Sequence, residues 1–191
     1  MARPRQFDES GAVDAAMRAF WSAGYEGTST QDLCAATGLG RSSIYNTFSS
    51  KHDLFERALR RYMTAKNADT FEVLDGPGTA SDKLRAVLWR VVDAPEDDPL
   101  GCLVVNATVE LGPRDPEVAA LLRADLDRRK AALAAVVRAG QAAGEIDNRS
   151  DPADLTQFVI ATIGGMRVAA RGGAGRETLA GIAETAMRCL R

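Results

Sequence analysis

The sequence has little of the chemistry that metal centres and most catalytic sites use. Its 191 residues include a single histidine, His52, and three scattered cysteines, Cys34, Cys102 and Cys189. No CxxC or HExxH spacing occurs, and there is no recognisable nucleophile–base pair or cofactor loop. An odd number of scattered cysteines forms no disulfide framework and is typical of a reducing cytoplasm. We therefore expect no metal, no cofactor and no enzymatic activity.

Long apolar runs and a strong charge excess are also missing. No apolar run reaches the roughly 18 residues of a membrane span, and no apolar core follows Arg3 and Arg5 as it would in a secretory signal. We therefore expect a cytoplasmic protein without membrane association. The net charge is −2, with nine basic and seven acidic side chains in residues 1–66 and 15 and 19 in residues 67–191. This mild basic excess does not by itself indicate nucleic-acid binding.

The pattern of apolar residues is helical almost throughout, and no segment shows the alternation of a strand. Turns are marked by glycine and proline, as in Gly76-Pro77-Gly78. Asp115-Pro116-Glu117 and Asp151-Pro152-Ala153-Asp154 each combine an N-cap, a proline at the first helical position and an acidic first turn. The sequence therefore predicts an all-α fold of about nine helices.

Residues 28–48 predict two short helices joined by a tight turn. Thr28 or Ser29 can cap the first helix, each with a polar partner three residues later. Gly38 can end that helix in the left-handed conformation. The second helix is expected over residues 41–48, with its apolar side chains facing the first. Two helices joined in this way form a helix-turn-helix.

The outward face of the second helix is polar and rich in hydrogen-bonding groups, namely Arg41, Ser42, Ser43, Tyr45, Asn46 and Thr47. Arginine pairs well with guanine, asparagine with adenine, and serine or threonine with several bases. Tyr45 and Lys51, which begins the next helix, suit contacts with phosphate. From this hairpin alone two interpretations are open: a DNA-reading head, or a helix pair whose exposed face is merely solvated.

Six motifs follow one another in a single register between Ala15 and Leu59: Ala15-Ala16-Met17-Arg18-Ala19-Phe20, Gly24-Tyr25, Thr28-Ser29, Thr37-Gly38, Ile44-Tyr45-Asn46-Thr47-Phe48 and Ser50-Lys51-His52-Asp53-Leu54. Together they resemble the DNA-binding region of the TetR family of transcription regulators. The resemblance implies that Thr28, Tyr45 and Lys51 contact phosphates while residues 41–47 read the major groove. Gly40 replaces a frequent serine, and Asn46-Thr47 replaces frequent aromatic or imidazole residues, so no operator sequence can be inferred from a relative.

The resemblance also implies an organisation and a function. Residues 1–50 would form the helix-turn-helix DNA-binding domain, and residues 51–191 a ligand-binding and dimerisation domain. The expected partners are a palindromic double-stranded operator, a second copy of the chain and an unidentified small-molecule effector. The leading hypothesis is a repressor that its ligand releases from the operator. The alternatives are an activator of the same fold, a helical enzyme, and a helix-turn-helix protein that acts only through protein partners.

Two apolar helices late in the chain are the predicted dimer interface, since family architecture pairs the last two long helices with those of a second subunit. Gly164-Gly165 would allow close approach of the backbones. The candidate contacts are Leu155, Val159, Thr162, Ile163, Met166, Leu179, Ile182 and Ala186. The alternative is that the same stripes pack within one chain.

A ligand pocket is predicted among the middle helices, also from family architecture. Its candidate residues are Phe71, Trp89, Cys102, Leu103, Val105, Asn106 and Phe158. An apolar lining with sparse polar groups suits a small, largely apolar ligand. The alternative for each of these residues is an ordinary place in the core. Cys102 is either a sensor of electrophiles or oxidants or a small buried hydrophobic residue.

Overall fold

The structure is a computed structural model that describes residues 8–94 and 101–191, and it confirms the all-α prediction for them. Within these two ranges the chain forms nine helices and no strand. The helices are α1 (Glu9–Ala23), α2 (Thr30–Thr37), α3 (Arg41–Thr47), α4 (Lys51–Asp75), α5 (Ala80–Val92), α6 (Leu103–Glu110), α7 (Pro116–Ala142), α8 (Pro152–Arg171) and α9 (Arg176–Cys189). None of them is long and apolar enough to cross a membrane.

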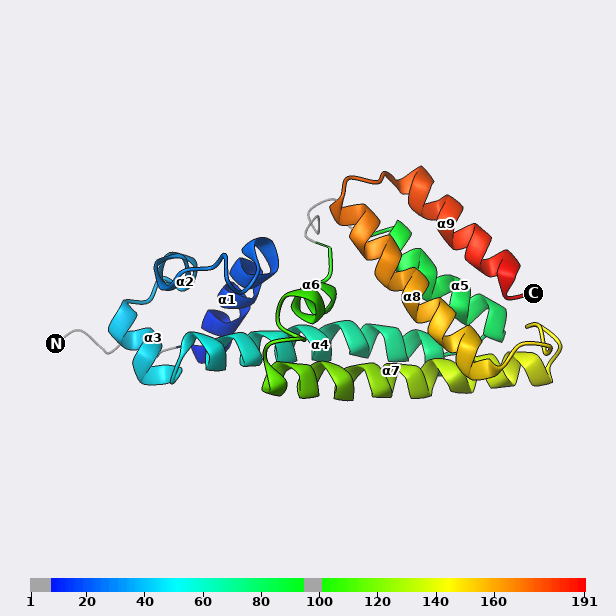
Figure 1. The fold of residues 1–191 in the computed structure, drawn as a ribbon, viewed down its shortest axis with the longest axis horizontal. Coiled ribbons are helices and arrows are strands. Elements are labelled where there is room, and N and C mark those ends of the chain that lie inside the picture. The colour runs from blue at the N-terminus through cyan, green and yellow to red at the C-terminus, as the bar shows by residue number, and fades with distance from the viewer. Residues whose placement is uncertain (1–7, 95–100) are drawn as a thin grey trace.

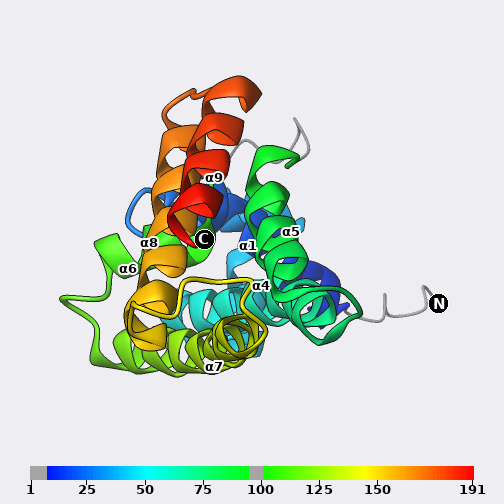
Figure 2. The ribbon, with the colours of Figure 1, turned by 90° about the vertical axis from the view of Figure 1, so that its right-hand side faces the viewer.

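The molecule is elongated, with α1–α3 grouped at one end and α5, α8 and α9 at the other (Figure 1). The two longest helices, α4 and α7, lie side by side along the long axis and connect these ends (Figures 1 and 2). Helix α6 is short and lies between α1 and α8. Helices α4 and α6 therefore each contact both ends of the molecule.

Local signals in the sequence explain where several helices begin. Asp115 and Asp151 are N-caps, each followed by a proline at the start of its helix, as predicted for α7 and α8. Thr79 and Asp82 form a reciprocal capping box at the start of α5. Proline has no amide donor to satisfy, and the cap side chains accept hydrogen bonds from the first free amides of each helix, so these starts are specified locally.

Two hydrophobic clusters form the interior, and they do not divide at residue 50. The first cluster joins α1–α3 to α4 as far as Met63, and also includes Leu103 of α6 and Val118 of α7. The second cluster lies among α5, α7, α8, α9 and the end of α4. The helix-turn-helix end is therefore packed directly on helices of the C-terminal part. The predicted domain boundary at residue 50 does not coincide with the division between the two clusters.

Candidate nucleic-acid interface and ligand pocket

Helix α2 is fixed by a cap at its start and by a glycine at its end, where the turn to α3 begins. The Ser29 hydroxyl accepts the Asp32 amide at 3.1 Å, and the Asp32 carboxylate accepts the Ser29 amide at 2.8 Å. Bonds from the Ser29 hydroxyl and amide hold the pKa of the Asp32 carboxyl below its ordinary value. Gly38 has φ 69°, the left-handed conformation that ends α2 at low steric penalty.

Helix α3 buries its apolar side and exposes its polar side. Ile44 and Phe48 are 1% and 0% exposed, and they anchor the helix on the first cluster. Of the predicted base-reading side chains, five are exposed and one is half-buried: Arg41, Ser42, Ser43, Tyr45 and Asn46 are exposed, and Thr47 is half-buried. The structure thus brings the predicted reading face together on one surface.

Three side chains on or beside this face contact neighbouring side chains. The Tyr45 hydroxyl lies 3.1 Å from the Thr30 hydroxyl of α2, so the ring is held across the gap between the two helices. The Arg41 guanidinium lies 5.8 Å from the centre of the Tyr45 ring. Lys51 begins α4, and its ammonium lies 4.3 Å from the centre of the Tyr25 ring. Such contacts restrict long side chains without neutralising their charge.

One predicted phosphate contact is not supported by the structure. The Thr28 side chain is buried, with 1% of its surface exposed, and its hydroxyl donates to the Gly24 carbonyl at 2.6 Å. Its hydroxyl is therefore occupied in shaping the loop between α1 and α2, because a buried hydroxyl needs a local partner. Sequence pattern could not separate this role from capping or phosphate binding, since all three use the same threonine.

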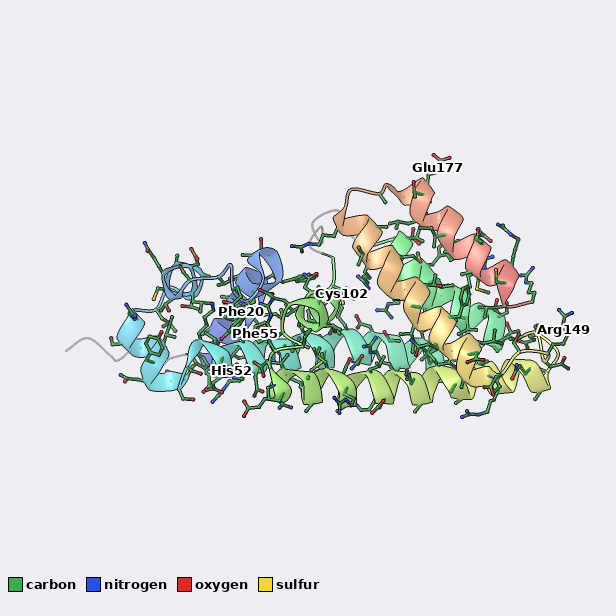
Figure 3. The ribbon with its side chains drawn as sticks, viewed as in Figure 1. Phe20, His52, Phe55, Cys102, Arg149 and Glu177 are labelled. Atoms are coloured by element: carbon green, nitrogen blue, oxygen red, sulfur yellow. The ribbon has the colours of Figure 1, made fainter. Side chains whose placement is uncertain are left out.

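The helix-turn-helix end is attached to the C-terminal part by polar bonds that the sequence did not reveal. The Glu110 carboxylate, at the end of α6, accepts the backbone amides of Tyr25 and Glu26 at 2.9 and 2.8 Å. His52 Nε2 lies 2.6 Å from Asp115 Oδ2, which joins α4 to the N-cap of α7. Figure 3 shows His52 on the α7 side of α4, below the Phe20–Phe55 contact. In the sequence, a single glutamate at the end of an apolar helix does not indicate that its carboxylate binds backbone amides of a distant loop.

His52 also lies in a small cluster of residues with metal-ligand chemistry. One ligand atom each from His52, Glu56 and Glu117 lies within 4.8 Å of the others. His52 is already hydrogen-bonded to Asp115, and Glu117 is exposed. The arrangement is accounted for as a polar link between α4 and α7.

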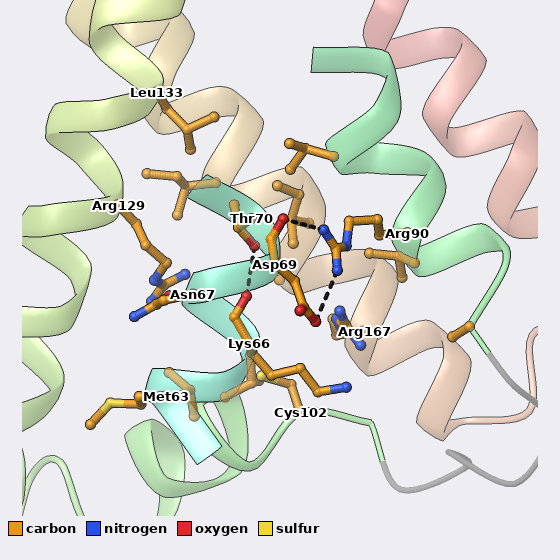
Figure 4. A pocket seen from close by; sticks show the side chains of 18 of the residues that line it. Met63, Lys66, Asn67, Asp69, Thr70, Arg90, Cys102, Arg129, Leu133 and Arg167 are labelled. Atoms are coloured by element: carbon orange, nitrogen blue, oxygen red, sulfur yellow. Dashed lines mark hydrogen bonds and ion pairs between the residues drawn. The ribbon is translucent and has the colours of Figure 1, made fainter. Parts of the chain in front are cut away.

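A cavity of about 750 Å³ lies between α4, α5, α7 and α8 and the start of α6 (Figure 4). This volume is in the range of small-molecule sites. Three of the predicted pocket residues, Trp89, Cys102 and Val105, line it. The apolar part of the wall includes Leu133 of α7 and Ile163 of α8.

The other four predicted pocket residues lie elsewhere. Leu103 is 1% exposed and belongs to the first cluster, and Phe71 packs on the second. Asn106 lines a smaller cavity of about 340 Å³ between α6, α8 and the end of α1. Phe158 is 38% exposed on the surface of α8. The helical pattern identifies apolar positions, but it does not say whether they face a cavity, a core or the outside.

The predicted interface residues lie mainly on the inward face of α8 and α9. Leu155, Val159, Met166, Leu179 and Ala186 are buried within the single chain, so the prediction that they contact a partner is not supported. Thr162 and Ile182 are half-buried, as is Ile163 at the cavity wall. The outward face of α8 is apolar too: Phe158, Ala161, Gly165 and Val168 are exposed there. With apolar residues on both sides of the helix, sequence periodicity does not say which side packs within the chain.

The cavity also contains charged groups that the sequence reading missed. Asp125 is only 2% exposed, and its carboxylate accepts Asn67 Nδ2 at 2.5 Å and Arg129 Nε at 3.0 Å. A buried carboxylate is stable only with such partners. The available signal was a polar residue at an inward position of an apolar stripe, as at Asn67 in α4.

Comparison with known proteins agrees with this architecture. The model of bacterial regulatory proteins of the tetR family matches residues 12–58. The model described as "Tetracyclin repressor-like, C-terminal domain" matches residues 80–187. The two matches cover the helix-turn-helix end and most of the helices that surround the cavity.

Similar individual proteins include two bacterial regulators. The transcriptional repressor ComR of Escherichia coli is 35% identical over 97% of this chain and 90% of its own length. The uncharacterized HTH-type regulator YezE of Bacillus subtilis is 37% identical over 62% of this chain and 62% of its own length, so the chain matches less than two thirds of YezE. Among solved structures, a cysteine-substituted CifR complexed with 26-base-pair operator DNA has a TM-score of 0.88 and 31% identity, with all of both chains covered.

The fold and the exposed face of α3 therefore define a helix-turn-helix regulator with a second helical domain around a cavity. The chain belongs to the TetR family of bacterial transcription regulators. It is a DNA-binding transcriptional regulator, as the sequence resemblance implied.

Proposed function

We propose that this chain is a homodimeric repressor that binds a palindromic operator and leaves it when a small molecule occupies the cavity. The observation that carries the proposal is the exposed polar face of α3, set on a core shared with the helices of the cavity. Repression rather than activation is favoured by the similarity to ComR, which is named a repressor.

At the DNA, Arg41, Asn46 and the serines between them would contact base edges in the major groove. Tyr45 and Lys51 flank that face and would contact phosphates. One head with so few cations binds weakly, whereas two heads on a palindrome bind together at a fixed spacing of one helical turn or a multiple of it. A dimer is therefore part of the DNA-binding proposal.

The outward faces of α8 and α9 are the proposed dimer surface. Phe158 and Val168 are 38% and 57% exposed, which is unusual for large apolar side chains on one stripe. A Cβ added at Gly165 of α8 or Gly181 of α9 would meet nothing within 4 Å in the single chain. Small residues beside exposed apolar ones allow two helix pairs to approach closely.

Two helices couple the cavity to the DNA-binding end. Helix α4 packs against the head through Phe55 and lines the cavity through Met63 and Asn67. Helix α6 lines the cavity at Val105 and bonds the loop after α1 through Glu110. A ligand that moves either helix changes the spacing of the two heads. By thermodynamic linkage, the operator must then weaken ligand binding by the same factor as the ligand weakens operator binding.

Operator binding is tested by selecting duplexes from a random library and measuring their affinity by fluorescence anisotropy over a salt series. We expect a palindromic site. Arg41→Ala or Asn46→Ala should weaken binding by about 1–3 kcal/mol at particular bases. Lys51→Ala should weaken binding to all DNA sequences and make the affinity depend less steeply on salt concentration.

Arg60→Ala is the matched control, because Arg60 is an exposed cation of α4 outside the reading face. If the three head variants keep wild-type affinity, or lose no more than Arg60→Ala does, α3 is not the reading helix. Selection that yields no preferred sequence would instead favour a protein that acts through protein partners.

The dimer is tested by light scattering and sedimentation of Val168→Asp against Val109→Asp. Both valines are exposed, at 57% and 76%. Val109 lies on α6 and lines the same small cavity as Val168, so it controls for a charge placed beside the α8–α9 surface and not on it. Val168→Asp should give monomers with weak operator binding, since a charge in an apolar interface is strongly unfavourable. Val109→Asp should remain dimeric. A wild-type monomer at micromolar concentration would contradict the proposal.

A further inference from the structure

Each carboxylate that the structure describes in the cavity wall already has a basic or amide partner. Asp69 Oδ2 lies 2.9 Å from Arg90 Nη2, and the same arginine donates to the Asp69 carbonyl. Asp125 is satisfied by Asn67 and Arg129, as described above. These carboxylates are therefore already compensated inside the protein.

Asp93, also in the wall, accepts two bonds from the Arg176 guanidinium at 2.7 and 3.0 Å. Among the residues that the structure describes, Arg167 of α8 is the cavity arginine without a hydrogen bond or ion pair. It is half-buried and offers up to five N–H donors. Figure 4 shows it near Lys66, a second cation of the wall.

The arrangement along α8 is amphipathic towards the cavity. Ile160, Ile163, Gly164 and Arg167 all line the cavity at positions i, i+3, i+4 and i+7, which share one helix face. An apolar stripe therefore ends in a guanidinium. Arg167 also lines the smaller cavity beside α6, so the cationic end is the one next to α6.

We propose that the effector is an amphipathic carboxylate: its acid group pairs with the Arg167 guanidinium, and its apolar body lies along Ile160 and Ile163. Guanidinium and carboxylate match in planar, two-bond geometry, and a half-buried site strengthens the pair. This assignment deepens the ligand part of the proposed function and rests on it. It replaces the sequence expectation of a largely apolar ligand with one that has a charged end.

The position of Arg167 also gives the acid group a route to the DNA-binding end. One turn further along α8, Arg171 Nη2 lies 3.5 Å from the Ser22 carbonyl of α1. Glu110 of α6, which also lines the smaller cavity, accepts the Tyr25 amide in the loop after α1. An anion drawn to Arg167 would therefore lie one helical turn from the Arg171–Ser22 contact, beside the small cavity that Glu110 also lines.

The test uses three probes of equal length and different charge: octanoate, octanamide and octylammonium. Binding to the full-length protein is followed by calorimetry and by the fluorescence of Trp89, which lines the cavity. The Trp89→Phe variant provides the fluorescence blank. Octanoate should bind at least about ten times more tightly than octanamide, the gain expected of a charge-assisted bond. Octylammonium should bind more weakly than either.

Arg167→Gln should reduce the preference for octanoate over octanamide to less than about threefold while leaving octanamide binding unchanged. Arg138→Gln is the matched control, since Arg138 is an exposed arginine of α7 outside the cavity wall, and it should keep the wild-type preference. Thermal unfolding of both variants without probe shows whether the fold is intact.

The proposal is overturned if octanamide binds as tightly as octanoate, if octylammonium binds best, or if Arg167→Gln keeps the preference. Absence of binding by all three probes also overturns it. Operator release is measured separately by anisotropy. A probe that binds through Arg167 but leaves operator affinity unchanged would support the anion site and contradict release by ligand. If octanamide releases the operator and Arg167→Gln does not change that release, the result would support release by ligand and contradict the anion site.

Discussion

The two ends of this protein treat polar groups in opposite ways. The DNA-binding end has an apolar interior, in which Phe20 and Phe55 meet edge to face at 5.1 Å, and it displays its hydrogen-bonding side chains outwards on α3. The other end places carboxylates and arginines inwards, around a cavity. A reading head benefits from a rigid core, because base contacts need fixed positions. A sensor benefits from unfilled space, which a ligand can occupy.

The largest expected effect comes from truncating one aromatic side chain in each region. Phe20→Ala should lower the free energy of unfolding by about 3–5 kcal/mol, because the side chain is fully buried in a packed core. Trp89→Ala should lower it by less than half as much, since Trp89 is half-buried and already faces a cavity. Urea unfolding measures both. Equal losses would mean that the cavity wall is as tightly packed as the head.

A carboxylate of each region provides the second comparison. Asp125→Ala should destabilise by about 1–3 kcal/mol, because it leaves Asn67 and Arg129 without their acceptor at a site that is 2% exposed. Asp14→Ala breaks the Asp14–Arg61 pair of the head, whose side chains are 41% and 51% exposed, and should change stability by about 0–1 kcal/mol. Chemical unfolding at low and high salt checks both. A larger loss from Asp14→Ala would reverse the comparison.

Matched capping boxes sharpen the contrast in function. Ser29→Ala and Thr79→Ala each remove the hydroxyl of a capping box, at α2 and α5, and each should reduce stability by about 0.5–2 kcal/mol. Only Ser29→Ala should also weaken operator binding, because α2 positions α3 and Thr30 orients Tyr45. Thermal unfolding and anisotropy are measured on both proteins. An equal loss of operator affinity in both variants would indicate a general loss of stability and not a role of α2 in positioning α3.

The smallest expected effect concerns the junction of the two regions at low pH. Burial alone would raise the pKa of Asp115, but hydrogen bonds from the Val118 amide and His52 outweigh it and hold the pKa below its ordinary value. The stability that this carboxylate contributes is therefore present above about pH 3.9, the ordinary aspartate value, and is lost as pH falls through the lower folded value. Asp115→Asn should lose less stability between pH 5 and pH 3 than the wild type. Urea unfolding midpoints at both pH values test this. An equal loss of stability in Asp115→Asn and in the wild type would contradict the prediction.

The DNA-binding end was readable from the sequence because its determinants are local. Caps, the glycine of the turn and the i, i+4 spacing of Ile44 and Phe48 act within a few residues of each other, so the helices and the outward face of α3 follow from order along the chain. Thr28 was the exception, since its hydroxyl is used by the Gly24 carbonyl and only the folded loop shows this.

The sequence by itself determined the all-α class, the helix starts at Asp115 and Asp151, and the family, because short-range hydrogen bonds and apolar periodicity depend on neighbouring residues. Only the tertiary structure decided which apolar face of α8 is inside. It exchanged the expected places of Phe158, now on the surface, and Ile163, now at the cavity. It also left Arg167 as an arginine of the cavity wall without an ion pair, because pairing among residues far apart in the chain depends on how the helices pack.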